Sequence, residues 1–268
     1  MVYILLLLIG FVGGTIGSLA GLGGGVVIVP SLLFLGGSLA LIPSISPQTA
    51  VGTSVLIIVF TGLSSTLAYL KQKKVDYVSG LIFFIGSGPG AIVGAYLNDK
   101  LELTFFYTLF GILMVFISFV LAISNKLKPI QFSKGLERTY IDNEGKETTY
   151  RVYIPLGIAF AFVVGALSGL FGIGGGALMV PLMLLVFRFP PSVAVATSML
   201  LVFLSAITGS IAHIQQGNVE WLYALALIPG AWFGAKFGAI LNKSLNEKTI
   251  VLVFRIFILV IGIRLILS

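Results

Sequence analysis

The sequence predicts an all-α polytopic membrane protein with two inverted-topology repeats, each a glycine-broken helical hairpin plus three transmembrane helices. Composition is the first observation: 58% of the residues are hydrophobic, 9% are charged and the mean hydropathy is +1.12, whereas soluble domains carry about 25% charged residues. Second, several apolar runs approach the ~20 residues with which a helix crosses a bilayer, and they do not alternate as barrel strands do. The third observation is an internal repeat.

Four blocks of sequence recur in the same order, which makes chance similarity a poor explanation. GSLAGLGGGVVIVPSLL (17–33) matches SGLFGIGGGALMVPLML (168–184), AVGTS (50–54) matches AVATS (194–198), KKVDY (73–77) matches GNVEW (217–221), and PGAIVGA (89–95) matches PGAWFGA (229–235). Such repeats indicate a duplicated architecture. We therefore divide the chain into a first transmembrane repeat (1–124), a polar connector (125–151) and a second transmembrane repeat (152–268).

Each half contains three unbroken apolar segments and one segment interrupted by glycines. We predict transmembrane helices over residues 48–70, 77–97 and 104–124, and over 192–213, 221–242 and 249–267. Each glycine triplet, Gly23–Gly25 or Gly174–Gly176, is followed by a proline five residues after its last glycine, which disfavours a continuous helix. The interrupted segment either crosses once as a kinked helix, or turns at its glycines and leaves by the face it entered.

The distribution of basic residues favours the turn-back alternative. It places twelve basic residues on one side and two opposite, against ten and four for a single crossing, and short loops rich in Lys and Arg stay in the cytoplasm. A hairpin plus three crossings is an odd number, so the second half is inverted. We expect a multi-pass protein of a prokaryotic inner or plasma membrane, with the 125–151 connector cytoplasmic and both termini outside. The twelve residues are Lys71, Lys73, Lys74, Lys126, Lys128, Lys134, Arg138, Lys146, Arg151, Arg188, Lys243 and Lys248.

The connector has two interpretations. It is charged and lacks apolar periodicity, so we favour a simple tether between the halves. The stretch YIDNEGKETTYRVYI alternates and contains an Asn-Glu-Gly turn, which is the pattern of a small β-hairpin.

The glycine breaks are the predicted substrate-binding site, with Gly23, Gly24, Gly25, Gly174, Gly175 and Gly176 as its residues. A helix that starts at such a break offers an anion free N–H groups and the positive end of its dipole. Each terminus contributes roughly 0.3–2 kcal/mol, whereas a charge at the bilayer centre costs at least ~2.5 kcal/mol. Two opposed termini therefore suit one small anion of low charge.

Hydroxyl side chains recur at equivalent positions and are predicted to line the same site. These are Thr53 and Ser54 in the first half and Thr197 and Ser198 in the second. Their hydroxyls can donate to an anion. The alternative is a bond to the carbonyl of the preceding helical turn.

Four further residues are weaker candidates for substrate contact or coupling. Gln48 precedes the first hydroxyl pair, and Lys236 and Arg255 are cations inside predicted spans whose long side chains can also snorkel to the interface. His213 is the only histidine; it could relay a proton, although a structural role is favoured. Glycines spaced by four predict helix-contact faces: Gly13, Gly17, Gly21 and Gly25, and Gly230, Gly234 and Gly238.

Several classes of function are disfavoured by what the sequence lacks. There is no carboxylate in the middle of a predicted span and no cysteine, which argues against cation pumping through acids and against cysteine-based metal sites. One histidine does not make a zinc site, and nucleotide-binding motifs are missing. We therefore predict no catalytic residue, metal or cofactor, and we attribute the net charge of +7 to cytoplasmic loops rather than to nucleic-acid binding.

Taken together, the blocks GLGGGVVIVPSLL, AVGTS, GIGGGALMVPLML and AVATS, with the glycine faces after VDY and VEW, resemble the TauE/SafE sulfite exporter family of membrane permeases. The resemblance covers nearly the whole chain apart from the connector. It implies transport of sulfite or a small organosulfur anion such as sulfoacetate. The two glycine triplets would be the paired family motifs, and the hydroxyl pairs would occupy the second motif.

Three functions remain in view. The leading one is a secondary transporter in which an anion is held between the paired breaks and the halves give alternating access. A passive anion channel of the same architecture is the second, and a membrane scaffold or receptor acting through the 125–151 connector is the third. The expected partners are a small anionic substrate and the lipid bilayer, and a homodimer is left open.

Overall fold

The structure is a computed structural model that describes residues 2–36, 43–123, 135–141, 145, 147–242 and 247–266. Within these ranges the chain is almost entirely helical, with one two-stranded sheet. The elements in chain order are α1 (Val2–Ala20), α2 (Gly25–Gly36), α3 (Pro47–Lys71), α4 (Tyr77–Asp99), α5 (Leu103–Ile123), β1 (Leu136–Ile141), β2 (Glu147–Val152), α6 (Ile154–Phe171), α7 (Gly176–Leu185), α8 (Pro191–Gln215), α9 (Trp221–Leu241) and α10 (Glu247–Ile266).

The helices confirm a polytopic α-helical membrane protein. Seven helices of the described chain are long and apolar enough to cross a bilayer, namely α1, α3, α4, α5, α6, α8 and α9. The six predicted unbroken spans correspond to α3, α4, α5, α8, α9 and α10. Many large apolar side chains point outward from these helices, such as Ile85 and Phe119, about 60% exposed, as expected for a surface that lipid covers.

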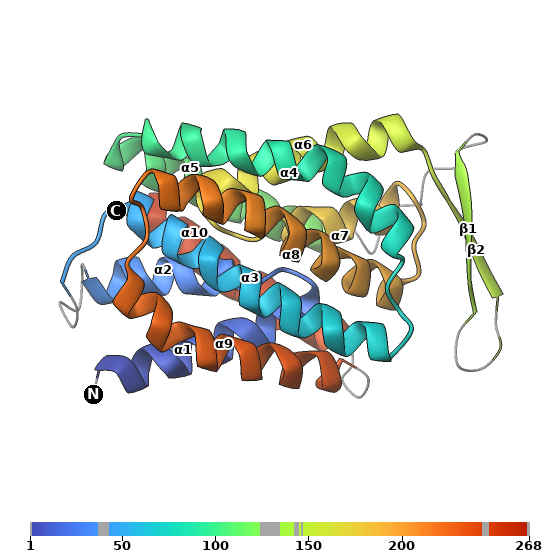
Figure 1. Cartoon of the computed structure of the whole chain (residues 1–268), viewed down its shortest axis with the longest axis horizontal. Coiled ribbons are helices and arrows are strands. Elements are labelled where there is room, and N and C mark those ends of the chain that lie inside the picture. The colour runs from blue at the N-terminus through green and yellow to red at the C-terminus, as the bar shows by residue number, and fades with distance from the viewer. Residues whose placement is uncertain are drawn as a thin grey trace.

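Both predicted helix breaks are present. α1 ends at Ala20 and α2 begins at Gly25, while α6 ends at Phe171 and α7 begins at Gly176. α2 and α7 have only 12 and 10 residues, about 18 and 15 Å at 1.5 Å per residue, which is too short to cross a bilayer alone. In Figure 1 both chain ends lie at the left end of the bundle, whereas the β-hairpin lies at the right end.

The helices of each half pack mainly against helices of the other half. α1 of the first half packs along α9 of the second, and α6 of the second half packs along α4 of the first. The central helices α3 and α8 contact each other, as do α5 and α10. Every such contact therefore has its counterpart when equivalent helices of the halves are exchanged.

Glycines make the α1–α9 contact close, as their spacing predicts. A Cβ added at Gly230, Gly234 or Gly238 would meet a backbone carbonyl of α1. The four-residue series in α1 is divided differently: Gly13 and Gly17 face the start of α2, while Gly21 and Gly25 belong to the break. The prediction of one helix-contact face is therefore wrong for that series, because the turn brings α2 back against α1.

The connector forms a β-hairpin, so the favoured tether interpretation is wrong for its described residues. β1 and β2 pair antiparallel in a register from Leu136 opposite Val152 to Ile141 opposite Glu147. Tyr150 and Val152 are buried against the helical bundle. The alternating pattern thus reflects a sheet with one face packed on the protein.

Candidate functional site

The two helix breaks lie directly against each other in the interior. A Cβ added at Gly25 would collide with the carbonyl oxygen of Gly172, and one added at Gly176 would collide with that of Gly21. A Cβ at Gly23 would lie 3.3 Å from the Cα of Gly174. The segments 21–30 and 171–181 are buried throughout. The structure thus brings Gly23, Gly25, Gly174 and Gly176 together across the two halves, whereas Gly24 and Gly175 face their own halves, at Gly13 and at Val164 and Ser168.

Backbone conformation explains why most of these positions are glycine. φ is +74° at Gly21, +87° at Gly23 and +89° at Gly24, and the second break repeats this pattern, with +67° at Gly172, +85° at Gly174 and +61° at Gly175. Glycine adopts this left-handed region without the steric cost that a side chain adds. Gly172 also caps α6, with its N–H donating to the Ser168 carbonyl.

The serines of the two hydroxyl pairs tie each break to the other half. The Ser54 hydroxyl donates to the Gly172 carbonyl at 3.0 Å, and the Ser198 hydroxyl donates to the Gly21 carbonyl at 2.9 Å. The Gly172 carbonyl is the one that abuts Gly25, and the Gly21 carbonyl is the one that abuts Gly176. Both serines are fully buried. In this structure their protons are donated to the carbonyls of the breaks and so position them, and contact of these serines with a substrate stays a prediction.

The threonines of the same pairs also bridge the halves, through residues outside the breaks. The Thr53 hydroxyl accepts the backbone N–H of Glu220 at 2.9 Å, and the Thr197 hydroxyl accepts that of Asp76 at 3.0 Å. Asp76 and Glu220 are the residues that immediately precede α4 and α9. The repeated Thr-Ser motif therefore fastens two elements of the opposite half, and each threonine keeps its own proton available for donation.

The first turns of α2 and α7 carry N–H groups that the break leaves without an acceptor. Val27 and Ile28 both donate to the Gly24 carbonyl, and Met179 donates to that of Gly175. Among the described residues, no acceptor binds the N–H groups of Gly25, Val26 or Ala177. These donors belong to helix N-termini, where the dipole favours an anion.

Two apolar side chains occupy the space beside the breaks. Ile58 reaches Gly23, Gly25 and Gly174, and Val202 reaches Gly23. Ile58 and Val202 occupy equivalent positions, each five residues after the threonine of its hydroxyl pair, and both are buried. Sequence reasoning missed them because an aliphatic residue in a membrane helix carries no signal of its own.

His213 and Gln48 have structural partners away from the breaks. The His213 Nε2 lies 2.9 Å from the Gly169 carbonyl, and the equivalent Tyr69 hydroxyl donates to the Ser18 carbonyl at 2.8 Å. His213 is fully buried, and its Nδ1 finds no partner in the described part of the chain. The Gln48 amide donates to the Leu101 carbonyl at 2.8 Å, which ties the start of α3 to the α4–α5 turn.

The two intramembrane cations are not brought to the breaks by any contact of the described chain. Lys236 is exposed on the outside of α9, beside Phe237. Arg255 is half-buried in α10, and its backbone carbonyl accepts the Ser118 hydroxyl at 3.2 Å. The described residues also contain no group of three His, Cys, Asp or Glu side chains that could hold a metal ion.

A polar cluster around Asp76 is the part of the structure that sequence reasoning did not anticipate. The Asp76 carboxylate, at the start of α4, accepts hydrogen bonds from Ser79, Arg138 and Tyr150. The VDY/VEW repeat singled out the position, but nothing in the sequence indicated that residues of the connector would reach it.

Comparison with known proteins gives one family and a consistent set of relatives. The family described as sulfite exporter TauE/SafE matches residues 6–265. A Bacillus subtilis (strain 168) protein named "Probable membrane transporter protein YunE" is 56% identical over 99% of this chain and 98% of its own length. Proteins of Methanocaldococcus jannaschii and Xylella fastidiosa, also named probable membrane transporter proteins, are 27% and 26% identical over 91% and 96% of this chain and 88% and 92% of theirs. No solved structure matches the chain.

Proposed function

Because the chain belongs to the sulfite exporter TauE/SafE family and is a membrane transporter, we propose that it is a secondary transporter of a small sulfur oxyanion or organosulfonate. Sulfite and sulfoacetate are representative substrates. The anion would bind between the two glycine breaks. No enzyme activity is part of this proposal.

The observation that carries the proposal is the pair of opposed helix N-termini. Gly25 and Val26 at one break and Ala177 at the other have N–H groups free of described acceptors. An anion could accept these hydrogen bonds and gain from both helix dipoles. Thr53 and Thr197 are proposed to add hydroxyl donors, while Ser54 and Ser198 hold the carbonyls of the breaks in place.

Alternating access is supported by the exchanged packing of the halves. The first half begins at the end of the bundle opposite the β-hairpin, and the second begins beside the hairpin (Figure 1), which is the relation that inverted repeats require. We place the hairpin end in the cytoplasm, because Lys71 ends α3 there and Lys73, Lys74 and Arg188 lie in the turns at that end. Both termini would then be outside.

The breaks must separate for an anion to enter. Backbone meets backbone at Gly25 and Gly176, and Ile58 and Val202 pack beside the glycines. We interpret this arrangement as an occluded conformation without substrate. Motion of one half relative to the other would withdraw the two aliphatic side chains and expose the amides to one side of the membrane at a time.

Flux of labelled sulfite or a sulfonate into liposomes containing the purified protein tests the function. We expect saturable transport that Gly24→Val abolishes, because a side chain at φ +89° would be strained and would meet the Gly13 carbonyl at 2.6 Å. Gly217→Asn is the matched control, since Gly217 has φ +73° and no atom within 4 Å, and asparagine tolerates this conformation. Transport that survives at Gly24→Val and at Gly175→Val would contradict the proposed site.

The same measurement separates the alternatives. A passive channel of this architecture would give flux that does not saturate and does not respond to a proton gradient. A scaffold or receptor would give no flux for any sulfur anion. The hairpin surface that such a scaffold would offer is partly engaged within the chain, because Arg138 and Tyr150 already bind Asp76.

A further inference from the structure

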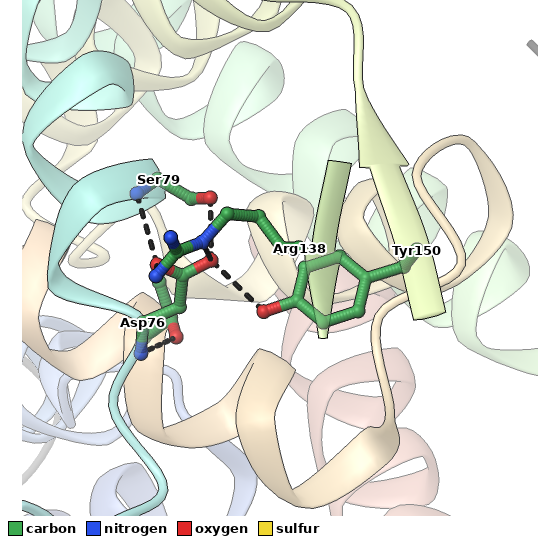
Figure 2. Close-up of polar contacts among 5 residues, drawn as sticks. Asp76, Ser79, Arg138 and Tyr150 are labelled. Atoms are coloured by element: carbon green, nitrogen blue, oxygen red, sulfur yellow. Dashed lines mark hydrogen bonds and ion pairs between the residues drawn. The ribbon is translucent and has the colours of Figure 1, made fainter. Parts of the chain in front are cut away.

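The β-hairpin forms hydrogen bonds to the buried carboxylate of Asp76, at the start of α4 (Figure 2). Arg138 of β1 donates to both oxygens of Asp76, with its Nη2 3.0 Å from Oδ1 and its Nε 3.3 Å from Oδ2. The Tyr150 hydroxyl of β2 donates to Oδ2 at 2.9 Å. Ser79 completes the set from α4 itself, with its N–H 3.2 Å from Oδ1 and its hydroxyl 2.6 Å from Oδ2. The Asp76 side chain is only 3% exposed.

The same hairpin also contacts the second half. The Tyr150 ring packs against Phe189, in the α7–α8 segment, with ring centroids 4.3 Å apart. Phe189 and Phe187 in turn pack on Phe83 of α4. The hairpin therefore joins the start of α4 to the segment that leads into α8, at the point where Thr197 of α8 accepts the Asp76 N–H.

The opposite end of the molecule has the equivalent turn without this attachment. Glu220 occupies the place of Asp76 in the repeat, and its N–H donates to Thr53 as that of Asp76 donates to Thr197. Its carboxylate makes no side-chain cap of α9, and no described residue forms an ion pair or hydrogen bond with it. Among the described residues, the hairpin contact with Asp76 has no counterpart at Glu220.

We propose that the hairpin is a strap that holds its own end of the transporter closed, and that opening this end requires Asp76 to leave Arg138 and Tyr150. The inference rests on the proposed function only in that the halves move relative to each other. Breaking one partner of a buried charge pair leaves the other charge poorly solvated. Removing Arg138 therefore destabilises the strapped conformation and favours the open one, in which water can reach Asp76.

Asp76 and Tyr150 keep the protonation states that this contact needs over the physiological pH range. Burial by itself would raise the pKa of Asp76, but hydrogen bonds from Ser79, Arg138 and Tyr150 outweigh it and hold that pKa below its ordinary value. Burial and the nearby Asp76 carboxylate raise the pKa of the Tyr150 phenol, so it stays a donor. A lowered carboxyl pKa stabilises the contact above the ordinary value of about 4 and loses its effect as the pH falls through the lowered value.

Cysteine labelling measures the strap directly, because the chain contains no cysteine of its own. Ala194→Cys places a reporter in the first turn of α8, at the end of the molecule that carries the hairpin. Ala50→Cys places one at the equivalent position of α3, at the opposite end. Both alanines are fully buried. A membrane-impermeant maleimide is added to vesicles of either orientation. Arg138→Gln removes the ion pair and the two charged hydrogen bonds to Asp76, so we expect it to raise the labelling rate of Ala194→Cys at least roughly tenfold.

Control variants distinguish opening of the hairpin end from a general destabilisation of the fold. Arg151→Gln alters another arginine of the same hairpin, whose ion pair with Glu137 is exposed, and should leave labelling unchanged. Tyr150→Phe removes one hydrogen bond to Asp76 but keeps the ring on Phe189, and should give a smaller rise. The proposal is overturned if Arg138→Gln leaves the labelling of Ala194→Cys unchanged or raises that of Ala50→Cys equally. Labelling needs no known substrate, so this result is independent of the flux measurement.

Discussion

The glycines of the two breaks meet different physical requirements at the residue scale. Gly23 and Gly24 have positive φ, which a helix break on its own would lead one to expect. Gly25 has helical conformation, and only the carbonyl of Gly172 in the other half explains why no side chain fits there. The sequence predicts the first requirement, because it is local. The second depends on a neighbour 147 positions away, which local patterns do not reveal.

The repeated hydroxyls show the same division. Their recurrence predicts that Ser54 and Ser198 have equivalent roles, and the structure gives them equivalent bonds to the Gly172 and Gly21 carbonyls. Whether a buried hydroxyl serves a ligand or the backbone depends on which acceptor lies opposite, and a single sequence does not contain that information. Their contact with substrate stays a prediction.

His213 gives a prediction at this scale, because its equivalent in the first half is Tyr69. Both residues satisfy a carbonyl near the C-terminal end of a broken-helix segment, Gly169 and Ser18 respectively. A donor is thus required there, rather than a group that titrates. We expect His213→Gln to keep the pH profile of transport, whereas His213→Ala lowers stability by about 1–3 kcal/mol because the carbonyl loses its partner.

Flux between roughly pH 6 and 8, spanning the ordinary histidine pKa, and thermal unfolding in detergent check this pair of variants. Tyr69→Phe is the matched control in the first half. It removes the equivalent hydrogen bond, to the Ser18 carbonyl, without changing a histidine. A pH profile that flattens in His213→Gln alone would assign His213 a role in proton coupling.

At the scale of elements, the length of the apolar runs located the helices well. The predicted spans 48–70, 77–97 and 221–242 became Pro47–Lys71, Tyr77–Asp99 and Trp221–Leu241, because apolar length in lipid leaves the chain little choice other than a helix. The structure of the connector was harder to predict from the sequence. Its strands are short and polar, and they are held by burial of Tyr150 and Val152 on the bundle, a tertiary contact that outweighs weak local preference.

The α1–α9 contact gives a prediction at this scale. A side chain at Gly234 would meet the carbonyl of Phe11, and Thr15 donates to the Gly234 carbonyl at 3.1 Å. Gly234→Val must therefore push the two helices apart, at a cost of about 1–3 kcal/mol. We expect the apparent midpoint of thermal unfolding in detergent to fall by roughly 5 °C. Phe233→Leu, at a neighbouring position that is 63% exposed, should leave it nearly unchanged; equal shifts would mean that the close contact contributes little.

At the scale of the whole molecule, most of the close helix packing is between the two halves, so each half depends on the other for its structure. α1 packs mainly on α9 and α6 mainly on α4. Each break is also completed by the other half, through Gly172 for Gly25 and Gly21 for Gly176. The internal repeat predicted two halves, and their boundaries at residues 124 and 152 stay predictions. The repeat did not show that the main packing partners of α1 and α6 lie in the opposite half, because sequence similarity between the halves does not reveal which helices are in contact.

Because each half packs on the other, we predict that the chain tolerates a break in the connector when both fragments are expressed together, but that neither fragment folds alone. Fragments 1–124 and 125–268, expressed together, should copurify and recover substrate flux, since the cut removes no helix–helix contact and leaves the hairpin on the second fragment. Expressed alone, each fragment exposes the glycine face that the other half covers, and should be degraded or aggregate. Copurification through an affinity tag on one fragment, followed by size-exclusion chromatography, measures both outcomes. A first fragment that accumulated alone as a stable, monodisperse species would mean that α1, α2 and α4 pack without α6, α7 and α9, and would contradict the interdependence of the two breaks.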